Sequence, residues 1–143
     1  MIIPDVNLLV YAHNDRAPAH RAAKDWWEDC LNGRTPVGIP WVVAAAFVRL
    51  MTHPRILKSP LPVGQAVTHV RLWLEQPVAR ILQPGTRFAT IFFGYLEALG
   101  TGGDLTTDAQ LAALAVEHQA VLHSNDADFA RFSGLRWINP LGS

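Results

Sequence analysis

The chain has 143 residues, the length of one ordinary domain, and half of them are hydrophobic, which is enough to build a sizeable core. Twelve basic residues balance twelve acidic ones, so bulk positive charge is excluded as a basis for nucleic-acid binding, and any such contact must be local. The single cysteine, Cys30, excludes an internal disulfide. The longest apolar run, residues 41–48, is far shorter than the roughly 20 residues that span a bilayer. We therefore expect a cytoplasmic protein.

Short apolar segments alternate with helical patterns from one end of the chain to the other. In chain order we predict a strand at 2–3, a helix at 18–31, a strand at 37–39, a helix at 41–51, a loop at 55–62, a helix at 63–74, a strand at 79–82, a helix at 85–99, a helix at 108–118, a strand at 121–122, a short helix at 127–132 and a strand at 135–138. This alternation predicts an α/β fold with a mainly parallel sheet and helices on both faces. We find no repeat or linker, so one domain is expected over residues 1–143.

Four acids lie at strand ends or at a helix start, which are the positions where an α/β fold usually places its functional residues. Asp5 follows the first predicted strand, inside the apolar run "MIIPDVNLLVYA", and we expect it to start no helix directly. Asp126 and Asp128 follow the fourth strand, and Asp108 opens a helix. Because the carboxyl ends of parallel strands form the ligand-binding crevice of an open sheet, we expect these acids to converge on one edge.

Each of these acids except Asp5 also has a purely structural interpretation. Thr107-Asp108-Ala109-Gln110 has the pattern of a capping box, with Thr107 as the N-cap. The segment 125–128, "NDAD", could start its own short helix by capping. For Asp5, no such local role is visible.

Several carboxylates at one edge repel one another and raise at least one pKa, and a divalent cation removes this cost. Mg²⁺ and Mn²⁺ prefer oxygen ligands and bind through one or two carboxylates, waters and substrate phosphate. Such an ion can lower the pKa of a bound water and stabilise charge on a phosphate, while a neighbouring carboxylate accepts the proton. The acid pattern therefore predicts metal-dependent phosphoryl chemistry.

Four stretches together resemble the PIN domain, and more closely the VapC-type toxin ribonucleases of toxin–antitoxin pairs. They are "DVNLLVYA" at 5–12, "FVRLMTHP" at 47–54, "TDAQLAALAVEHQAVLHSND" at 107–126 and "DF" at 128–129. They occur in the family's order and span nearly the whole chain. The resemblance implies a three-layer α/β/α fold, Mg²⁺- or Mn²⁺-dependent endonucleolytic cleavage of RNA, a homodimer and a cognate VapB-type antitoxin.

The resemblance also implies roles for individual residues. Asp5, Asp108 and Asp126 match the family's metal-binding acids, and Asp128 matches an additional acid that many members carry, so all four are predicted to be catalytic. Asn7 and Asn125 would be polar neighbours of the site.

One position departs from the family pattern. Many PIN domains carry a further acid just before the segment that corresponds to "FVRL", where this chain has alanine at 44–46 and no acid anywhere in 37–74. The site would then have fewer ligands, weaker binding of a second metal, or a substitute such as Asp104.

Arg49 and the tryptophans have two interpretations each. Arg49 lies in an otherwise apolar helix, where it reaches solvent, pairs with a structural acid, or contacts the acidic cluster or an RNA phosphate. Trp41 and the pair Trp26-Trp27 suit the core or a partner surface, and base stacking is the less expected alternative.

Other functions remain open at this point. Phosphatases of the haloacid-dehalogenase type and response-regulator receivers also place an acid after the first strand. The former normally carry a second acid two residues on, where this chain has Asn7, and both need a late lysine, whereas the only lysines are Lys24 and Lys58. A non-catalytic PIN-like binding module and an RNA-processing nuclease without an antitoxin are further alternatives.

Overall fold

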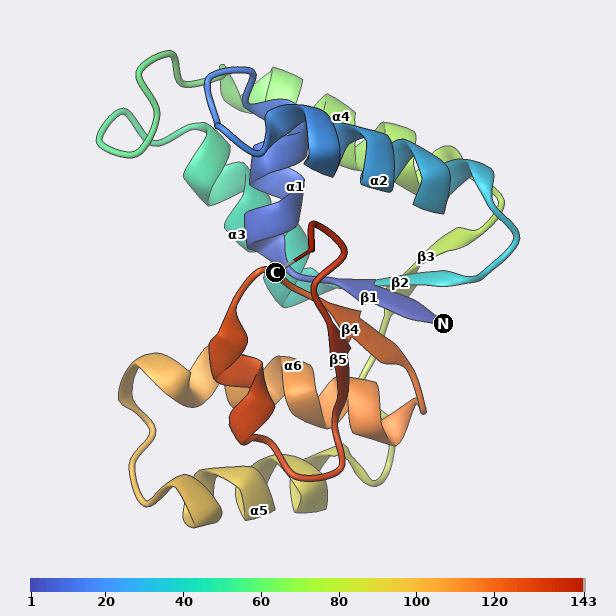
Figure 1. Cartoon of the computed structure of the whole chain (residues 1–143), viewed down its shortest axis with the longest axis vertical. Helices are drawn as coiled ribbons and strands as arrows, with labels where there is room; N and C mark the ends of the chain where they lie inside the picture. Colours follow the sequence, from blue (N-terminus) through green and yellow to red (C-terminus); the bar gives the residue numbers. More distant parts are fainter. Residues whose placement is uncertain (143) are drawn as a thin grey trace.

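The computed structural model describes residues 1–142, so the last residue of the predicted domain, Ser143, lies outside the described residues. Strands and helices alternate along the chain (Figure 1). The elements are β1 (Ile2–Pro4), α1 (Val6–His13), α2 (His20–Asn32), β2 (Val37–Pro40), α3 (Trp41–Met51), α4 (Val63–Glu75), β3 (Ala79–Leu82), α5 (Phe88–Leu99), the 3₁₀ helix η1 (Gly103–Leu105), α6 (Thr106–Glu117), β4 (Val121–His123), the 3₁₀ helix η2 (Ala127–Arg131) and β5 (Arg136–Ile138).

The five strands form one sheet in the order β3-β2-β1-β4-β5, and every neighbouring pair is parallel. The predicted parallel sheet is therefore confirmed. Ile2 of β1 is in register with Val37 on one side and with Val121 on the other. The strand order reverses between β1 and β4, and this is the switch point at which open α/β sheets bind ligands.

Helices cover both faces of the sheet, as Figure 1 shows. Helices α1 to α4 lie on one side, with α1 packed on α2 and α3, and α5 and α6 pack together on the other. The fully buried side chains Ile3, Ile39 and Leu122 come from three adjacent strands at the centre. The three-layer α/β/α architecture is confirmed. Among residues 1–142, no helix combines the length and apolarity that crossing a membrane would require.

Helix α1 was not predicted, and the expectation that Asp5 starts no helix is wrong. Asp5 is the N-cap of α1, and its Oδ1 accepts a hydrogen bond of 2.7 Å from the backbone N–H of Val6. The helix escaped prediction because it has no polar face: α2 and α3 cover it, and Leu8, Leu9 and Val10 are all buried.

The capping box proposed at residues 107–110 is also wrong. Helix α6 begins at Thr106, its N-cap is Leu105, and no side chain caps it. The 3₁₀ turn η1 runs directly into α6, so the N–H of Thr106 donates to the carbonyl of Gly103, and η1 takes the place of a side-chain cap. Asp108 still lies in the first turn, as predicted.

Candidate active site

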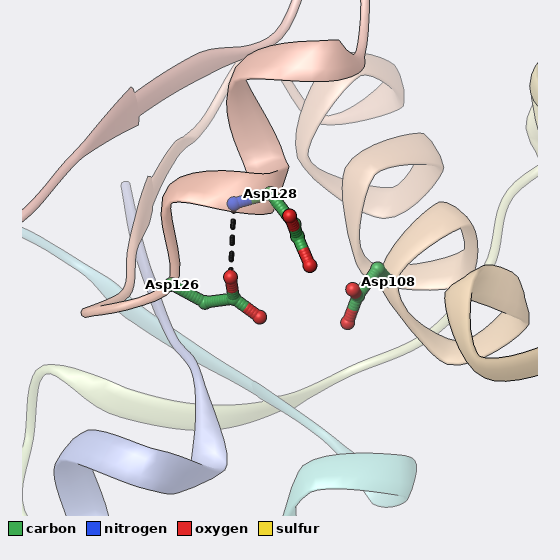
Figure 2. A group of neighbouring side chains, drawn as sticks. All are labelled: Asp108, Asp126 and Asp128. Carbon is green, nitrogen blue, oxygen red and sulfur yellow. Dashed lines mark hydrogen bonds between the residues drawn. The ribbon is translucent and has the colours of Figure 1, made fainter.

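Three carboxylates converge on a common point beside the end of β4. One oxygen from each of Asp108, Asp126 and Asp128 can be chosen so that all three lie within 4.8 Å of one another. Figure 2 shows the three side chains directed into the space between α6 and η2. Acids separated by about 20 residues in sequence therefore meet, as the strand-end argument predicted.

Asp126 combines a structural role with a place in this group. It is the N-cap of η2, and its Oδ1 accepts a hydrogen bond of 2.9 Å from the N–H of Asp128 (Figure 2). The predicted capping at residues 125–128 is confirmed. Because this cap occupies Oδ1 alone, Oδ2 remains available to a ligand. Capping and ligand binding are thus compatible at this residue.

Asp5 lies at the end of β1, next to this group but not within it. Its side chain is buried, with 8% of its surface exposed, and both oxygens accept hydrogen bonds. Val6 N–H donates to Oδ1 at 2.7 Å, and Ser124 Oγ donates to Oδ2 at 2.7 Å. Burial nevertheless raises the pKa of Asp5 above its usual value, and the charge of Asp126 adds to this rise.

Electrostatic repulsion within the site is concentrated on Asp108. Burial, followed by the charges of Asp126, Asp5 and Asp128, raises the pKa of Asp108 to about 6. Asp108 is therefore repelled electrostatically by all three other acids, although Asp5 lies outside the close group. An all-oxygen, acidic donor set of this kind fits a hard divalent cation, which would offset the repulsion.

Ser124 is a residue of the site that the sequence did not reveal. Its side chain is fully buried, and its hydroxyl donates to Asp5 and accepts a hydrogen bond of 3.0 Å from the N–H of Asp126. One hydroxyl therefore joins the acids that follow β1 and β4 across the switch point. The only available signal was a small polar residue between the apolar strand and Asp126.

No hydrogen bond or ion pair within residues 1–142 joins the other predicted residues to the three acids. Asn7 Oδ1 accepts a hydrogen bond from Leu8 N–H, and the exposed Asn125 accepts one from Asn139 Nδ2. Arg49 is exposed on α3, and none of the ion pairs within residues 1–142 includes it. Their roles remain predictions.

The possible substitute for the missing family acid also lies outside the group. Asp104 is exposed in η1 and does not belong to the three-acid cluster. Of the alanines at 44–46, Ala44 is buried in the core and Ala45 is exposed. The position of the missing acid therefore remains apolar.

Comparison with known proteins identifies the family. The family profile of the PIN domain matches residues 2–135. The chain belongs to the PIN-domain family. It is similar to Ribonuclease VapC33 of Mycobacterium tuberculosis, with 48% identity over 141 residues and 99% of each chain covered. It is also similar to Ribonuclease VapC37 of the same organism, with 44% identity over 140 residues, 98% of this chain and 97% of the other.

Solved structures share the fold of this PIN domain. VapBC2 from Rickettsia felis, bound to a DNA fragment from its promoter, matches with a TM-score of 0.70 at 21% identity, covering 97% of this chain and 98% of that one. VapC20 of Mycobacterium tuberculosis, described as a sarcin-ricin loop cleaving toxin, matches with a TM-score of 0.66 at 18% identity, covering 95% and 99%. The family match and the VapC relatives therefore rule out the phosphatase and receiver alternatives.

Proposed function

We propose that this PIN domain is the toxin of a type II toxin–antitoxin pair and acts as a metal-dependent endoribonuclease. The observation that carries the proposal is the group of Asp108, Asp126 and Asp128 at the switch point of a parallel sheet. The chain that bears it is 48% identical to a relative named as a ribonuclease over almost its full length. Both observations support hydrolysis of RNA phosphodiesters at this edge.

The proposed ion is Mg²⁺ or Mn²⁺, with Asp5, Asp108 and Asp126 as its predicted ligands. When bound, such an ion would lower the pKa of a water and stabilise charge on the phosphate. Asp5 would act from a fixed position, because Val6 N–H and Ser124 Oγ hold its two oxygens. Asp126 is held at one oxygen, Oδ1, by its cap on η2.

Asp128 is the proposed proton acceptor. It is exposed at the rim of the group, and Arg131 Nε lies 3.7 Å from its Oδ1. A carboxylate at the rim can take the proton from the attacking water while the more enclosed acids hold charge. Its exposure lets the proton pass on to solvent.

The proposed partners are an antitoxin encoded with this chain and a second copy of the chain. Helix α5 supports a partner surface, because it is strongly apolar and yet buries none of its residues completely. Phe93 on this helix is 56% exposed. Solved VapBC complexes, including VapBC-1 from nontypeable Haemophilus influenzae, share the fold. We further propose that the protein acts as a single domain in the cytoplasm.

A non-catalytic binding module is the second candidate, and the alanines at 44–46 favour it. An experiment separates the two. Antitoxin-free protein is incubated with structured RNAs, with Mg²⁺ or Mn²⁺ and with EDTA, beside Asp108→Asn and Asp128→Asn. Asp104→Asn is the matched control, since Asp104 is an exposed acid outside the group. Discrete metal-dependent cuts that both site variants lose and the control keeps support the nuclease. RNA or partner binding without cleavage by folded wild-type protein favours the binding module.

A further inference from the structure

A small hollow lies at the carboxyl edge of the sheet, on the β2–β3 side of Asp5. We call it the edge hollow. Its volume is about 190 Å³, and its walls include Pro40, Trp41, Leu82, Gln83, Gln110 and Leu114. Pro40 and Leu82 are the last residues of β2 and β3, so the floor of the hollow is the sheet edge itself.

The edge hollow lies at the same edge of the sheet as the acids. Ile2 and Val37 are in register, so β1, which Asp5 follows, and β2, which ends at Pro40, are neighbouring strands with their carboxyl ends at the same edge. On the other wall, Gln110 lies in the first turns of α6 two residues after Asp108, and the two side chains project to different sides of this helix. One of the elements that line the hollow, α6, therefore also carries a predicted metal ligand.

The lining combines an exposed aromatic ring with two free amides. Trp41 has 57% of its surface exposed at the start of α3, which is unusual for the largest apolar side chain. The side-chain amides of Gln83 and Gln110 have no hydrogen-bond partner within residues 1–142. An amide offers both donor and acceptor, and its orientation decides which donors and acceptors on the edge of a base it can pair with.

This combination matches the way proteins hold unpaired bases. Single-stranded RNA is bound by stacking bases on aromatic rings and by hydrogen bonds to their edges. The hollow is smaller than the roughly 300 Å³ at which sites for drug-sized ligands begin, which suits one ring system. The chain has no net charge, so contacts to bases would supply binding that phosphate attraction alone does not.

We propose that the edge hollow receives one unstacked nucleobase of the RNA substrate, from a nucleotide close to the cleaved phosphate. Trp41 stacks on the base, and Gln83 and Gln110 select its edge. The proposal rests on the proposed ribonuclease function and adds a source of sequence preference to it.

Binding is tested first, with a protein that leaves the RNA intact. Asp108→Asn is titrated with single-stranded hexaribonucleotides of A, C or U, and tryptophan emission is compared with that of Asp108→Asn/Trp41→Phe. We expect quenching that the double variant lacks, while its affinity stays within about threefold because phenylalanine still stacks. Adding Trp41→Ala instead weakens binding by roughly 5- to 100-fold. Ile56→Ala, which removes another half-exposed apolar side chain, leaves affinity unchanged.

Cleavage gives the second readout. Gln83→Ala and Gln110→Ala are expected to change which base stands at the cut sites and to raise KM more than they lower kcat. Unchanged cut positions and KM in Trp41→Ala would overturn the subsite while leaving the nuclease intact. Trp41 emission that responds to protein concentration or to a protein partner, and not to RNA, would overturn it as well. If wild type cuts no RNA but its Trp41 is quenched by the hexamers, the nuclease proposal fails and the base site stands.

Discussion

The two strand ends at the switch point carry the same local motif and use it differently. At both, an aspartate that follows a parallel strand caps the next helix: Asp5 comes directly after β1 and caps α1, and Asp126 comes three residues after β4 and caps η2. Asp5 is buried with both oxygens hydrogen-bonded, whereas Asp126 is half-buried and has one oxygen free of the cap. A capping aspartate after a strand therefore gives an enclosed carboxylate at one end and an open one at the other, and the difference is the second hydrogen bond that Ser124 donates to Asp5.

The largest effect is expected from removing charge at the open end. Asp126→Asn keeps an oxygen for the cap on Asp128 N–H but removes the carboxylate from the group. Replacing a partner of a metal ligand typically costs 10- to 100-fold, so loss of a ligand itself should lower cleavage by at least about 100-fold. Initial rates on one RNA substrate measure this. A variant that stays within threefold of wild type would exclude Asp126 from catalysis.

At the enclosed end the expected effect falls on stability as well. Asp5→Ala removes the α1 cap and leaves the buried Ser124 hydroxyl without its acceptor, which together should lower the free energy of unfolding by about 1–3 kcal/mol. Asp128→Ala, at an exposed rim position, should change it by less than about 0.5 kcal/mol. Urea denaturation followed by circular dichroism compares the two. Equal losses would remove the contrast between the enclosed and open acids.

Ser124 connects the two ends, and Ser124→Ala tests that connection. We expect cleavage to fall by about 10- to 100-fold, because Asp5 loses a fixed orientation and Asp126 N–H loses its acceptor. Ser124→Thr keeps the hydroxyl and should recover part of the activity. Metal affinity, measured alongside the rate, distinguishes a positioning role from a loss of fold. No rescue by threonine, together with an unchanged metal affinity, would contradict the positioning role.

The smallest expected effect is a pH dependence of stability in metal-free protein. Folding raises the pKa of Asp108 to about 6, whereas the unfolded carboxyl titrates near 3.9. Between these values the folded state binds more protons, so the contribution of Asp108 to stability falls as pH rises from about 4 to 6. Asp108→Asn should flatten this part of the Tm–pH curve. A curve for the variant that is as steep as that of wild type would assign the dependence to other groups.

Prediction from sequence succeeded for elements whose structure depends on residues nearby in the chain. Helix α3 was predicted at its observed bounds, and β3 likewise, because an apolar run with proline or a turn at its ends leaves few alternatives. The convergence of Asp108 with Asp126 followed from parallel topology alone.

Prediction from sequence failed where contacts between residues far apart in the chain determine the structure. Helix α1 needs neighbours on nearly every side, so its sequence shows no periodicity. Ser124 gains its role only when β1 and β4 become adjacent, which joins residues 119 positions apart. The start of α6 depends on η1 rather than on Thr107.

The central claim is that Asp5, Asp108 and Asp126 hold a divalent cation that cleavage requires. Calorimetric titration of metal-free protein with Mn²⁺ at pH 7 tests it most directly, with Asp108→Asn as the site variant and Asp104→Asn as the matched control. Our account predicts binding by wild type and the control, and affinity at least tenfold weaker in Asp108→Asn. Equal Mn²⁺ affinity in all three proteins would contradict it.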